Sequence, residues 1–230
     1  MQCGFDYTHE VPNKLWIFDL DDTLYPSNNG VWNAIGDRIN QFIIENLNYP
    51  PETVHLFRED LFHKYGTTLR GLVVEHNIDP YSYLNYVHVV PIEEYIQPNP
   101  ALADSLKQLA GEKIIFTNAD KNHALRVLDR LGLGGIFSRI VDVLDVWPHC
   151  KPMPEAFTRM IELSGNFNPT DSILVEDSLR NISTAKSMGF NTVLVSPTSV
   201  EDGLADAVLS SINDINSLRN RESWKEYWNG

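Results

Sequence analysis

Short hydrophobic runs recur along the chain without alternating with polar residues. Runs of this kind are typical of strands that are buried on both faces of a sheet. We therefore expect strands at residues 14–19, 113–117, 139–143, 172–176 and 191–196.

Segments with a helical spacing of apolar residues separate the later runs. They lie at residues 123–131, 154–163 and 179–188. The first and third end next to a glycine and the second begins with a proline, and both are common helix boundaries. Strands that alternate with such helices predict βαβ units, so the expected fold class is α/β with a Rossmann-like parallel sheet.

One long stretch, residues 24–97, contains no convincing strand. Its apolar spacings suit helices at residues 31–47, 52–65 and 69–76. Closely spaced prolines at residues 90–100 predict an extended linker that returns to the sheet. We expect residues 24–97 to form an inserted helical module, and residues 1–23 and 98–230 to form a discontinuous core.

Composition and charge narrow the class of protein. The chain has 230 residues, of which 43% are hydrophobic, so it can bury a sizeable core. Its 18 Lys and Arg against 31 Asp and Glu give a formal net charge of −13, which argues against nonspecific binding to nucleic acid or anionic membranes. No apolar run approaches the ~18 residues of a membrane helix, and the first residues do not resemble a signal peptide, so we expect a cytoplasmic protein. Cys3 and Cys150 lie too far apart to indicate a disulfide framework or a zinc site.

The densest polar cluster follows the first expected strand and reads Asp19-Leu20-Asp21-Asp22-Thr23. Ligands bind at this carboxyl edge in open α/β sheets. Two carboxylates as close as Asp19 and Asp21 need a divalent cation or a shared proton. An isolated pair of this kind is more often an acidic loop or a helix cap, so the interpretation depends on the other strand ends.

Three further groups of polar residues stand at element boundaries, two at the ends of expected strands and one before an expected helix. They are Thr117-Asn118, Lys151-Pro152 and Glu176-Asp177. Each group alone is typical of a helix cap, a surface charge or a helix start. In this order, and together with the aspartate cluster, they indicate a metal-dependent phosphoryl site.

These groups resemble the four ordered motifs of the haloacid dehalogenase (HAD) superfamily, here Asp19-x-Asp21-x-Thr23, Thr117, Lys151-Pro152 and Glu176-Asp177. The resemblance extends from Trp16 to about Val195. The helical stretch after the first strand is similar to the C1 cap of this superfamily, and the segment between Thr117 and Lys151 is too short for a C2 cap. The resemblance implies a phosphatase whose core supplies the chemistry and whose cap selects the substrate.

The resemblance also implies roles for the acidic residues. Asp19 is expected to attack phosphorus in line and form an aspartyl phosphate. Asp21 is expected to protonate the leaving oxygen and then to deprotonate the hydrolytic water. The implied cofactor is Mg²⁺, bound by the Asp19 carboxylate, the Asp21 backbone carbonyl and Asp177, with Glu176 behind these ligands.

Three residues are expected to bind the phosphoryl oxygens and stabilise charge during transfer: Thr117, the backbone near Asn118, and Lys151. Dehalogenases of the superfamily generally lack the second aspartate, so Asp21 favours phosphate chemistry. Relatives that cleave phosphonates use a cap lysine. The lysine of the helical stretch here, Lys64, is expected to lie on the surface.

Several segments resemble the pyrimidine 5′-nucleotidase branch of the superfamily. They are residues 24–26, 65–72, 76–79, 86–88, 116–119 and 126–128. The implied substrate is a small phosphomonoester, a nucleoside 5′-monophosphate such as UMP or CMP. Arg70 and Thr67 are candidates to hydrogen-bond it, and Tyr65 or Tyr25 to stack on its base. Alternatively, the tyrosines belong to the cap core and Arg70 makes an internal ion pair.

Two other functions stay open. A β-phosphoglucomutase-like sugar-phosphate mutase or phosphatase shares both aspartates and the Glu-Asp ending. A phospho-accepting signalling receiver has a similar set of groups, although its acceptor follows a later strand and it has no long helical insert. A monomer or a homodimer is expected, because the aromatic residues Trp224, Tyr227 and Trp228 can dock on the body of the chain or on a second subunit.

Overall fold

A computed structural model of the chain describes residues 14–198, 200–201 and 203–228. Cys3 and the start of the chain considered above lie outside these residues. The described part folds around a six-stranded sheet with the order β3-β2-β1-β4-β5-β6. The strands are β1 (Leu15–Phe18), β2 (Glu112–Phe116), β3 (Arg139–Val141), β4 (Ser172–Glu176), β5 (Asn191–Val195) and β6 (Ala207–Leu209). All neighbouring strands run parallel, which confirms the α/β fold class.

Strand β1 lies in the middle of the sheet between β2 and β4, and its four residues are all buried. Trp16 and Phe18 pack into the hydrophobic cluster on one face of the sheet. Leu15 and Ile17 pack into the cluster on the other face. Both faces are therefore apolar, which explains why the run in the sequence does not alternate.

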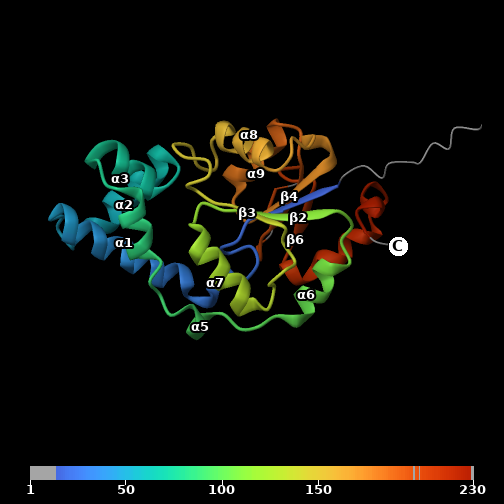
Figure 1. The fold of residues 1–230 in the computed structure, drawn as a ribbon, viewed down its shortest axis with the longest axis horizontal. Helices are drawn as coiled ribbons and strands as arrows, with labels where there is room; N and C mark the ends of the chain where they lie inside the picture. Colours follow the sequence, from blue (N-terminus) through green and yellow to red (C-terminus); the bar gives the residue numbers. More distant parts are fainter. Residues whose placement is uncertain (1–13, 199, 202, 229–230) are drawn as a thin grey trace, which may run out of the picture.

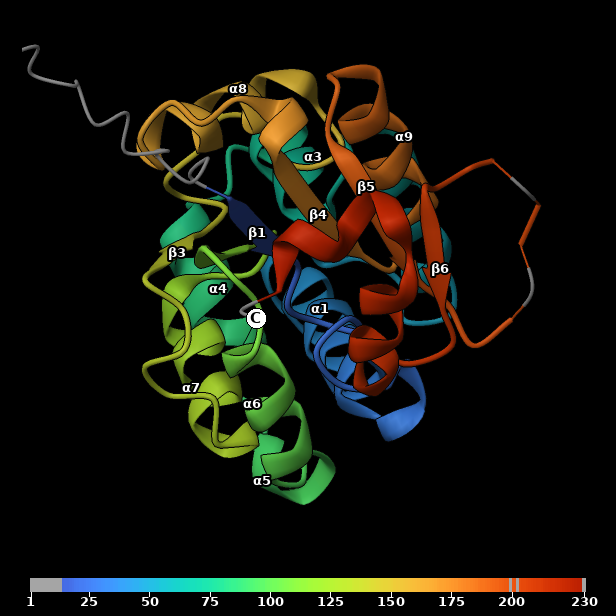
Figure 2. The same ribbon diagram turned by 90° about the vertical axis from the view of Figure 1, so that its right-hand side faces the viewer.

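Helices cover both faces of the sheet (Figures 1 and 2). Helices α8 (Pro154–Leu163) and α9 (Leu179–Ser187) lie on one face, and α6 (Pro100–Lys107) and α7 (Lys121–Leu131) lie on the other. Helix α8 has the predicted bounds, and α9 ends one residue earlier than predicted. Helix α7 begins before residue 123 because Asp120 caps it, accepting hydrogen bonds from the backbone N–H groups of Asn122 and His123. Helix α6 was not predicted.

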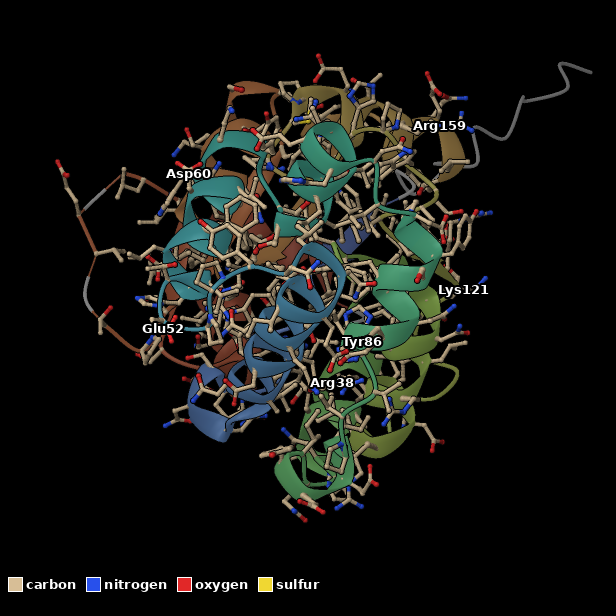
Figure 3. The ribbon with its side chains drawn as sticks, turned by 90° about the vertical axis from the view of Figure 1, so that its left-hand side faces the viewer. Arg38, Glu52, Asp60, Tyr86, Lys121 and Arg159 are labelled. Atoms are coloured by element: carbon tan, nitrogen blue, oxygen red, sulfur yellow. The ribbon has the colours of Figure 1, made fainter. Side chains whose placement is uncertain are left out.

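A helical insert separates β1 from α6. It contains a short 3-10 helix, η1 (Ser27–Asn29), and the helices α1 (Val31–Leu47), α2 (Val54–Tyr65), α3 (Thr68–His76), α4 (Pro80–Val87) and α5 (Ile92–Tyr95). Helix α1 has the predicted bounds, whereas α4 was not predicted and α5 interrupts the expected extended linker. Helices α1 and α4 are joined by Arg38, which lies 3.9 Å from the centre of the Tyr86 ring and donates to the Tyr86 carbonyl (Figure 3). The insert stands beside the carboxyl end of the sheet (Figure 1).

The return segment of the insert is hydrogen-bonded to the core. Arg126 of α7 donates to the backbone carbonyls of His88 at 2.9 Å and Val90 at 2.6 Å. One turn further along the helix, Arg130 donates to the carbonyl of Ile96 at 2.7 Å. Residues 88–96 are thus fastened to α7, and the division of the chain at residues 23 and 97 stays a prediction.

The C-terminal segment packs on the core of its own chain. It continues from β6 through the 3-10 helices η3 (Ile212–Asn220) and η4 (Glu222–Tyr227). The rings of Tyr227 and Trp228 meet the Trp16 ring edge to face, with centroids 5.8 and 5.5 Å away. The backbone N–H of Ala110 also donates to the Tyr227 carbonyl at 2.9 Å. Of the two alternatives considered for these aromatic residues, the structure shows docking on the body of their own chain.

Across the part of the chain that the structure describes, no helix combines the length and the apolar character needed to cross a bilayer.

Candidate active site

A cavity of about 490 Å³ opens at the carboxyl end of the sheet. Its floor comes from the strand ends and its opposite wall from helices α1 to α4 of the insert. The polar residues of the floor include Asp19, Asp21, Thr117, Asn118, Lys151 and Asp177. All residues predicted to act in the chemistry therefore line a single cavity.

Strand pairing explains this convergence. Asp19 follows the last residue of β1, and its backbone N–H donates to the carbonyl of Val175 in β4 at 2.9 Å. This bond continues the parallel ladder by one residue and brings Asp19 beside Glu176 and Asp177. Thr117 follows β2 in the same way, and its N–H bonds to Val141 of β3. The side chains meet because the carboxyl ends of parallel strands share one edge of the sheet.

Lys151 is the cation at the centre of the site. Its buried ammonium donates to Asp19 Oδ1 at 2.6 Å, to Glu176 Oε2 at 2.8 Å and to the carbonyl of Phe116 at 2.8 Å. Burial alone would lower the pKa of Lys151, but the charges and hydrogen bonds of Asp19 and Glu176 raise it overall. Lys151 is therefore held charged against the carboxylates.

Asn118 fixes the position of Lys151. Its side-chain oxygen accepts from the Lys151 backbone N–H at 2.9 Å, and its side-chain nitrogen donates to the Lys151 carbonyl at 3.0 Å. The Asn118 side chain is thus engaged with the protein, and a phosphate contact from the nearby backbone stays a prediction. Thr117 is almost fully buried, and its hydroxyl accepts from the Ala119 N–H at 3.0 Å.

Three carboxylates form the acidic cluster of the site. Oxygen atoms of Asp19, Glu176 and Asp177 lie within 4.8 Å of one another. Burial, followed by the charges of Glu176 and Asp19, raises the pKa of Asp177 to about 9. Burial and the Glu176 charge likewise raise the pKa of Asp19 to about 7 against the opposing effect of Lys151. One ammonium does not balance three carboxylates, so the cluster favours a further cation.

The carboxylates of the cluster differ in their free binding capacity. Glu176 accepts four hydrogen bonds, from Lys151, Asn181 and the backbone N–H groups of Asp177 and Ser178. These bonds use all the acceptor positions of a carboxylate, which fits its expected place behind the metal ligands. Among the described residues, the Asp177 side chain accepts one hydrogen bond, from the Thr23 hydroxyl at 3.3 Å, and it keeps capacity for a ligand. This set of hard oxygen donors fits Mg²⁺.

Asp21 is bound by two donors that the sequence analysis did not identify as partners. Its Oδ1 atom accepts from the Tyr25 hydroxyl at 2.5 Å and from His123 Nε2 at 2.8 Å. Burial would raise the pKa of Asp21, but the charge and hydrogen bond of His123, together with the bond from Tyr25, lower it overall. His123 was missed by the sequence analysis. The available signal was its place on the buried face of α7, one turn before Val127.

The structure separates the two candidate residues of the insert. Thr67 lines the cavity, and its hydroxyl oxygen caps α3 by accepting from the Arg70 N–H at 3.1 Å. The Arg70 guanidinium donates to the carbonyls of Pro148 and Tyr65, at 3.1 and 3.4 Å, and is not among the residues that line the cavity. These internal bonds go to carbonyls rather than to a carboxylate. Substrate contacts of Thr67 and Arg70 stay predictions.

The two tyrosines proposed to stack on a base have partners within the protein. Tyr65 donates to Glu75 at 2.7 Å, and Tyr25 is buried against Asp21. Lys64 is more than half exposed and pairs with the same Glu75, which confirms its expected place on the surface.

Comparison with known proteins agrees with this geometry. A sequence profile described as haloacid dehalogenase-like hydrolase matches residues 14–189, which is most of the chain. Phosphate metabolism protein 8 of Saccharomyces cerevisiae is 27% identical over 195 residues, which is 79% of this chain and 61% of the yeast protein. The chain thus spans about three fifths of the length of this relative.

Solved structures share the fold. A HAD phosphatase from Thermococcus onnurineus has a TM-score of 0.60 at 19% identity, covering 90% of this chain and 98% of that one. The HAD hydrolase YfnB from Bacillus subtilis, solved with magnesium, has a TM-score of 0.58 at 17% identity, covering 91% and 99%. These likenesses show the fold alone. Because the family profile covers more than half of the chain, the protein belongs to the haloacid dehalogenase-like hydrolases.

Proposed function

We propose that this hydrolase is a Mg²⁺-dependent phosphomonoesterase that acts through an aspartyl phosphate on Asp19. The observation that carries the proposal is a second aspartate, Asp21, in the same cavity as the buried Asp19. Asp21 supplies the acid and base that ester hydrolysis needs and that halide departure does not.

The first half of the proposed reaction transfers the phosphoryl group to the protein. A carboxylate oxygen of Asp19 bonds to phosphorus while the bond from phosphorus to the ester oxygen breaks. The departing oxygen keeps the electron pair of that bond and takes a proton from Asp21. The charge of the arriving phosphate favours the protonated form of Asp21.

The second half releases phosphate. A water molecule attacks the phosphorus of the aspartyl phosphate, and the Asp21 carboxylate takes a proton from that water. The bond between phosphorus and the Asp19 oxygen then breaks, which restores both carboxyl groups. Proton and oxygen balance is complete, because Asp21 receives from water the proton that it gave to the leaving group.

The surrounding residues would hold the phosphoryl group in line. Thr117, the backbone near Asn118 and the Lys151 ammonium are the proposed phosphate contacts. The Asp19 carboxylate, the Asp21 backbone carbonyl and Asp177 would hold Mg²⁺. When bound, the ion neutralises the charge that otherwise keeps a phosphate dianion away from these carboxylates.

The substrate we propose is a nucleoside 5′-monophosphate, with a pyrimidine base as the first choice. The support, beyond the motifs in the sequence, is the wall of the cavity opposite Asp19. Trp32 and Phe62 line this wall, with 48% and 40% of their surface exposed, and offer apolar faces to a base. The Arg180 guanidinium lies 5.3 Å from the centre of the Phe62 ring and adds a cation at the same place. In this proposal the insert acts as the cap that selects the substrate. The cytoplasmic location expected from the sequence stays a prediction.

The proposal is tested by measuring phosphate release from UMP, CMP, AMP, GMP, glucose 1-phosphate, glucose 6-phosphate and p-nitrophenyl phosphate, with Mg²⁺ and with EDTA. Mg²⁺-dependent release with a preference for UMP or CMP is the expected result. A preference for sugar phosphates, with transfer to sugar in place of water, would identify the mutase-like alternative. Absence of release from every compound would contradict the phosphatase assignment.

A further inference from the structure

The two carboxylate oxygens of Asp21 have different surroundings. Oδ1 accepts hydrogen bonds from the Tyr25 hydroxyl at 2.5 Å and from His123 Nε2 at 2.8 Å. Oδ2 accepts none from the residues that the structure describes, although Asp21 lines the cavity. A carboxylate oxygen has about two acceptor positions, so Oδ1 is fully occupied. When Asp21 is protonated, its proton must therefore sit on Oδ2.

Within the described part of the chain, the bond from Nε2 to Asp21 is the one hydrogen bond of the His123 side chain. The residue is almost completely buried, and among the described residues Nδ1 of its ring has no partner. Since a carboxylate is purely an acceptor, Nε2 must be the donor whether the ring is neutral or charged. A histidine that served packing alone has no need to direct its one polar bond at Asp21.

The orientation of the His123 ring is set from two sides. Asp120 accepts the backbone N–H of His123 at 3.0 Å, which fixes the start of α7. The ring itself stacks on His88 of the insert, with centroids 4.5 Å apart and planes 23° from parallel.

His88 is held in turn. Its Nδ1 atom contacts the second carboxylate oxygen of Asp120, and its carbonyl accepts from Arg126 at 2.9 Å. The insert therefore contacts Asp21 directly through Tyr25, and a second connection runs through His88 and His123.

We propose that His123 is a positioning residue that holds Oδ1 of Asp21 so that Oδ2 exchanges protons with the reacting oxygens. His88 and Asp120 keep the His123 ring in the orientation that this bond requires. The inference rests on the acid and base role proposed above for Asp21.

The proposal has a chemical signature that a purely structural role lacks. An alkyl or sugar oxygen leaves phosphorus with the electron pair of the broken bond and needs the Oδ2 proton as it departs. A p-nitrophenolate carries the same electron pair without a proton. Misplacing Oδ2 must therefore slow the cleavage of alkyl phosphates and leave the cleavage of p-nitrophenyl phosphate nearly unchanged.

The test uses a matched pair of variants, His123→Gln and His123→Asn. The Gln amide nitrogen reaches the position of Nε2 and can donate to Asp21, whereas the Asn amide reaches only the position of Nδ1. His123→Phe keeps a ring against His88 without a donor. The value to measure is kcat/KM, because it covers the steps through departure of the leaving group. The substrates are p-nitrophenyl phosphate and the best alkyl phosphate of the panel.

We expect His123→Asn and His123→Phe to lower kcat/KM for the alkyl phosphate about 30-fold, a part of the ~10²- to 10⁴-fold that general acid catalysis contributes. Their effect on p-nitrophenyl phosphate should stay within about threefold, and His123→Gln should recover most of the alkyl phosphate activity. Equal losses on both substrates, or a Gln variant no better than Asn, would overturn the positioning role and leave the phosphatase assignment standing. A wild-type chain that is inactive on every phosphate would contradict both the positioning role and the phosphatase assignment. If His123→Phe does not fold, the Gln and Asn pair alone decides.

Discussion

The Lys151 ammonium lies 2.6 Å from Oδ1 of Asp19, and both side chains are buried beneath the cavity. The same ammonium bonds to Glu176, so a single lysine supports two of the three clustered carboxylates. This contact leaves the other oxygen of Asp19 for attack on phosphorus. It also makes the stability of the metal-free protein depend on Lys151.

Replacing Lys151 with methionine removes the cation and leaves its carboxylates buried and unpaired. We expect the free energy of unfolding in EDTA to fall by about 3–5 kcal/mol, together with loss of phosphate release. Urea unfolding and the phosphate assay measure the two effects. The control is Lys64→Met, which removes an exposed lysine and should change neither quantity appreciably. A Lys151→Met protein as stable and active as the wild type would contradict the described role of this lysine.

Removal of the metal should expose the repulsion among the carboxylates. The pKa of Asp177 is about 9 in the folded metal-free protein, against an ordinary value of 3.8. The folded state therefore holds a proton that the unfolded state releases, and stability in EDTA should fall as the pH rises from about 4 toward 9. Asp177→Asn should flatten this decline and abolish stabilisation by Mg²⁺. Thermal unfolding measured across this pH range, with EDTA and with Mg²⁺, checks the pH dependence of stability and the stabilisation by Mg²⁺.

Asp206 supplies a control of opposite sign. Its carboxylate accepts hydrogen bonds from the Thr192 backbone and hydroxyl at 2.9 and 2.8 Å and lies 3.1 Å from the Lys186 ammonium. Burial would raise the pKa of Asp206, but these bonds lower it overall. The contribution of Asp206 to the free energy of unfolding is therefore fully present above the ordinary pKa of an aspartate. It is lost as the pH falls through the lowered pKa of the folded state. Asp206→Asn should destabilise the protein at neutral pH and leave the response to Mg²⁺ intact.

The aromatic wall of the cavity should recognise a base. Trp32→Ala and Phe62→Ala should raise KM for UMP about tenfold, because stacking of a base on an aromatic ring contributes ~1–3 kcal/mol. They should change KM for p-nitrophenyl phosphate much less. Its ring is bonded directly to the phosphate, without a ribose between them, and is therefore too close to the phosphate to stack on this wall. Steady-state kinetics with both substrates measure the difference. Equal KM changes for the two compounds would argue against a nucleotide subsite on these rings.

Arg70 is tested in the same assay. If Arg70 contacts the substrate, Arg70→Ala raises KM for UMP while the melting temperature stays constant. If its bonds to the Pro148 and Tyr65 carbonyls are its whole role, the melting temperature falls and KM stays constant. The comparison assigns the arginine either to the cavity or to the joint between insert and core.

The sequence predicted the strands well where burial on both faces produced continuous apolar runs, as in β1 and β4. It missed β6, because Ala207–Leu209 is too short to show a pattern and its middle residue is exposed. It also missed α4, whose first residue is Pro80. That proline sits where its lack of an N–H is harmless, after the Asp79 cap, but in the sequence it resembles a break.

The candidate site likewise contains residues that could be predicted from the sequence and residues that could not. Asp19, Thr117 and Asp177 were predictable because each follows a strand and the carboxyl ends of parallel strands converge. His88 and His123 were not predictable, because they lie 35 positions apart on separate elements and meet only through the return path of the insert. Periodicity shows that His123 faces the core, but it does not show that the neighbour it meets there is Asp21.

The most direct test of the central claim is to trap the phosphoryl group on the protein. An Asp21→Asn variant should still accept phosphate from p-nitrophenyl phosphate with Mg²⁺, since that leaving group needs no proton, but should not hydrolyse the intermediate. Rapid quenching and peptide mass spectrometry should then find one phosphoryl group per chain on Asp19, and none in an Asp19→Asn protein. A wild-type enzyme that hydrolyses p-nitrophenyl phosphate while the Asp21→Asn variant carries no phosphoryl group on Asp19, or carries it on another residue, would contradict the mechanism.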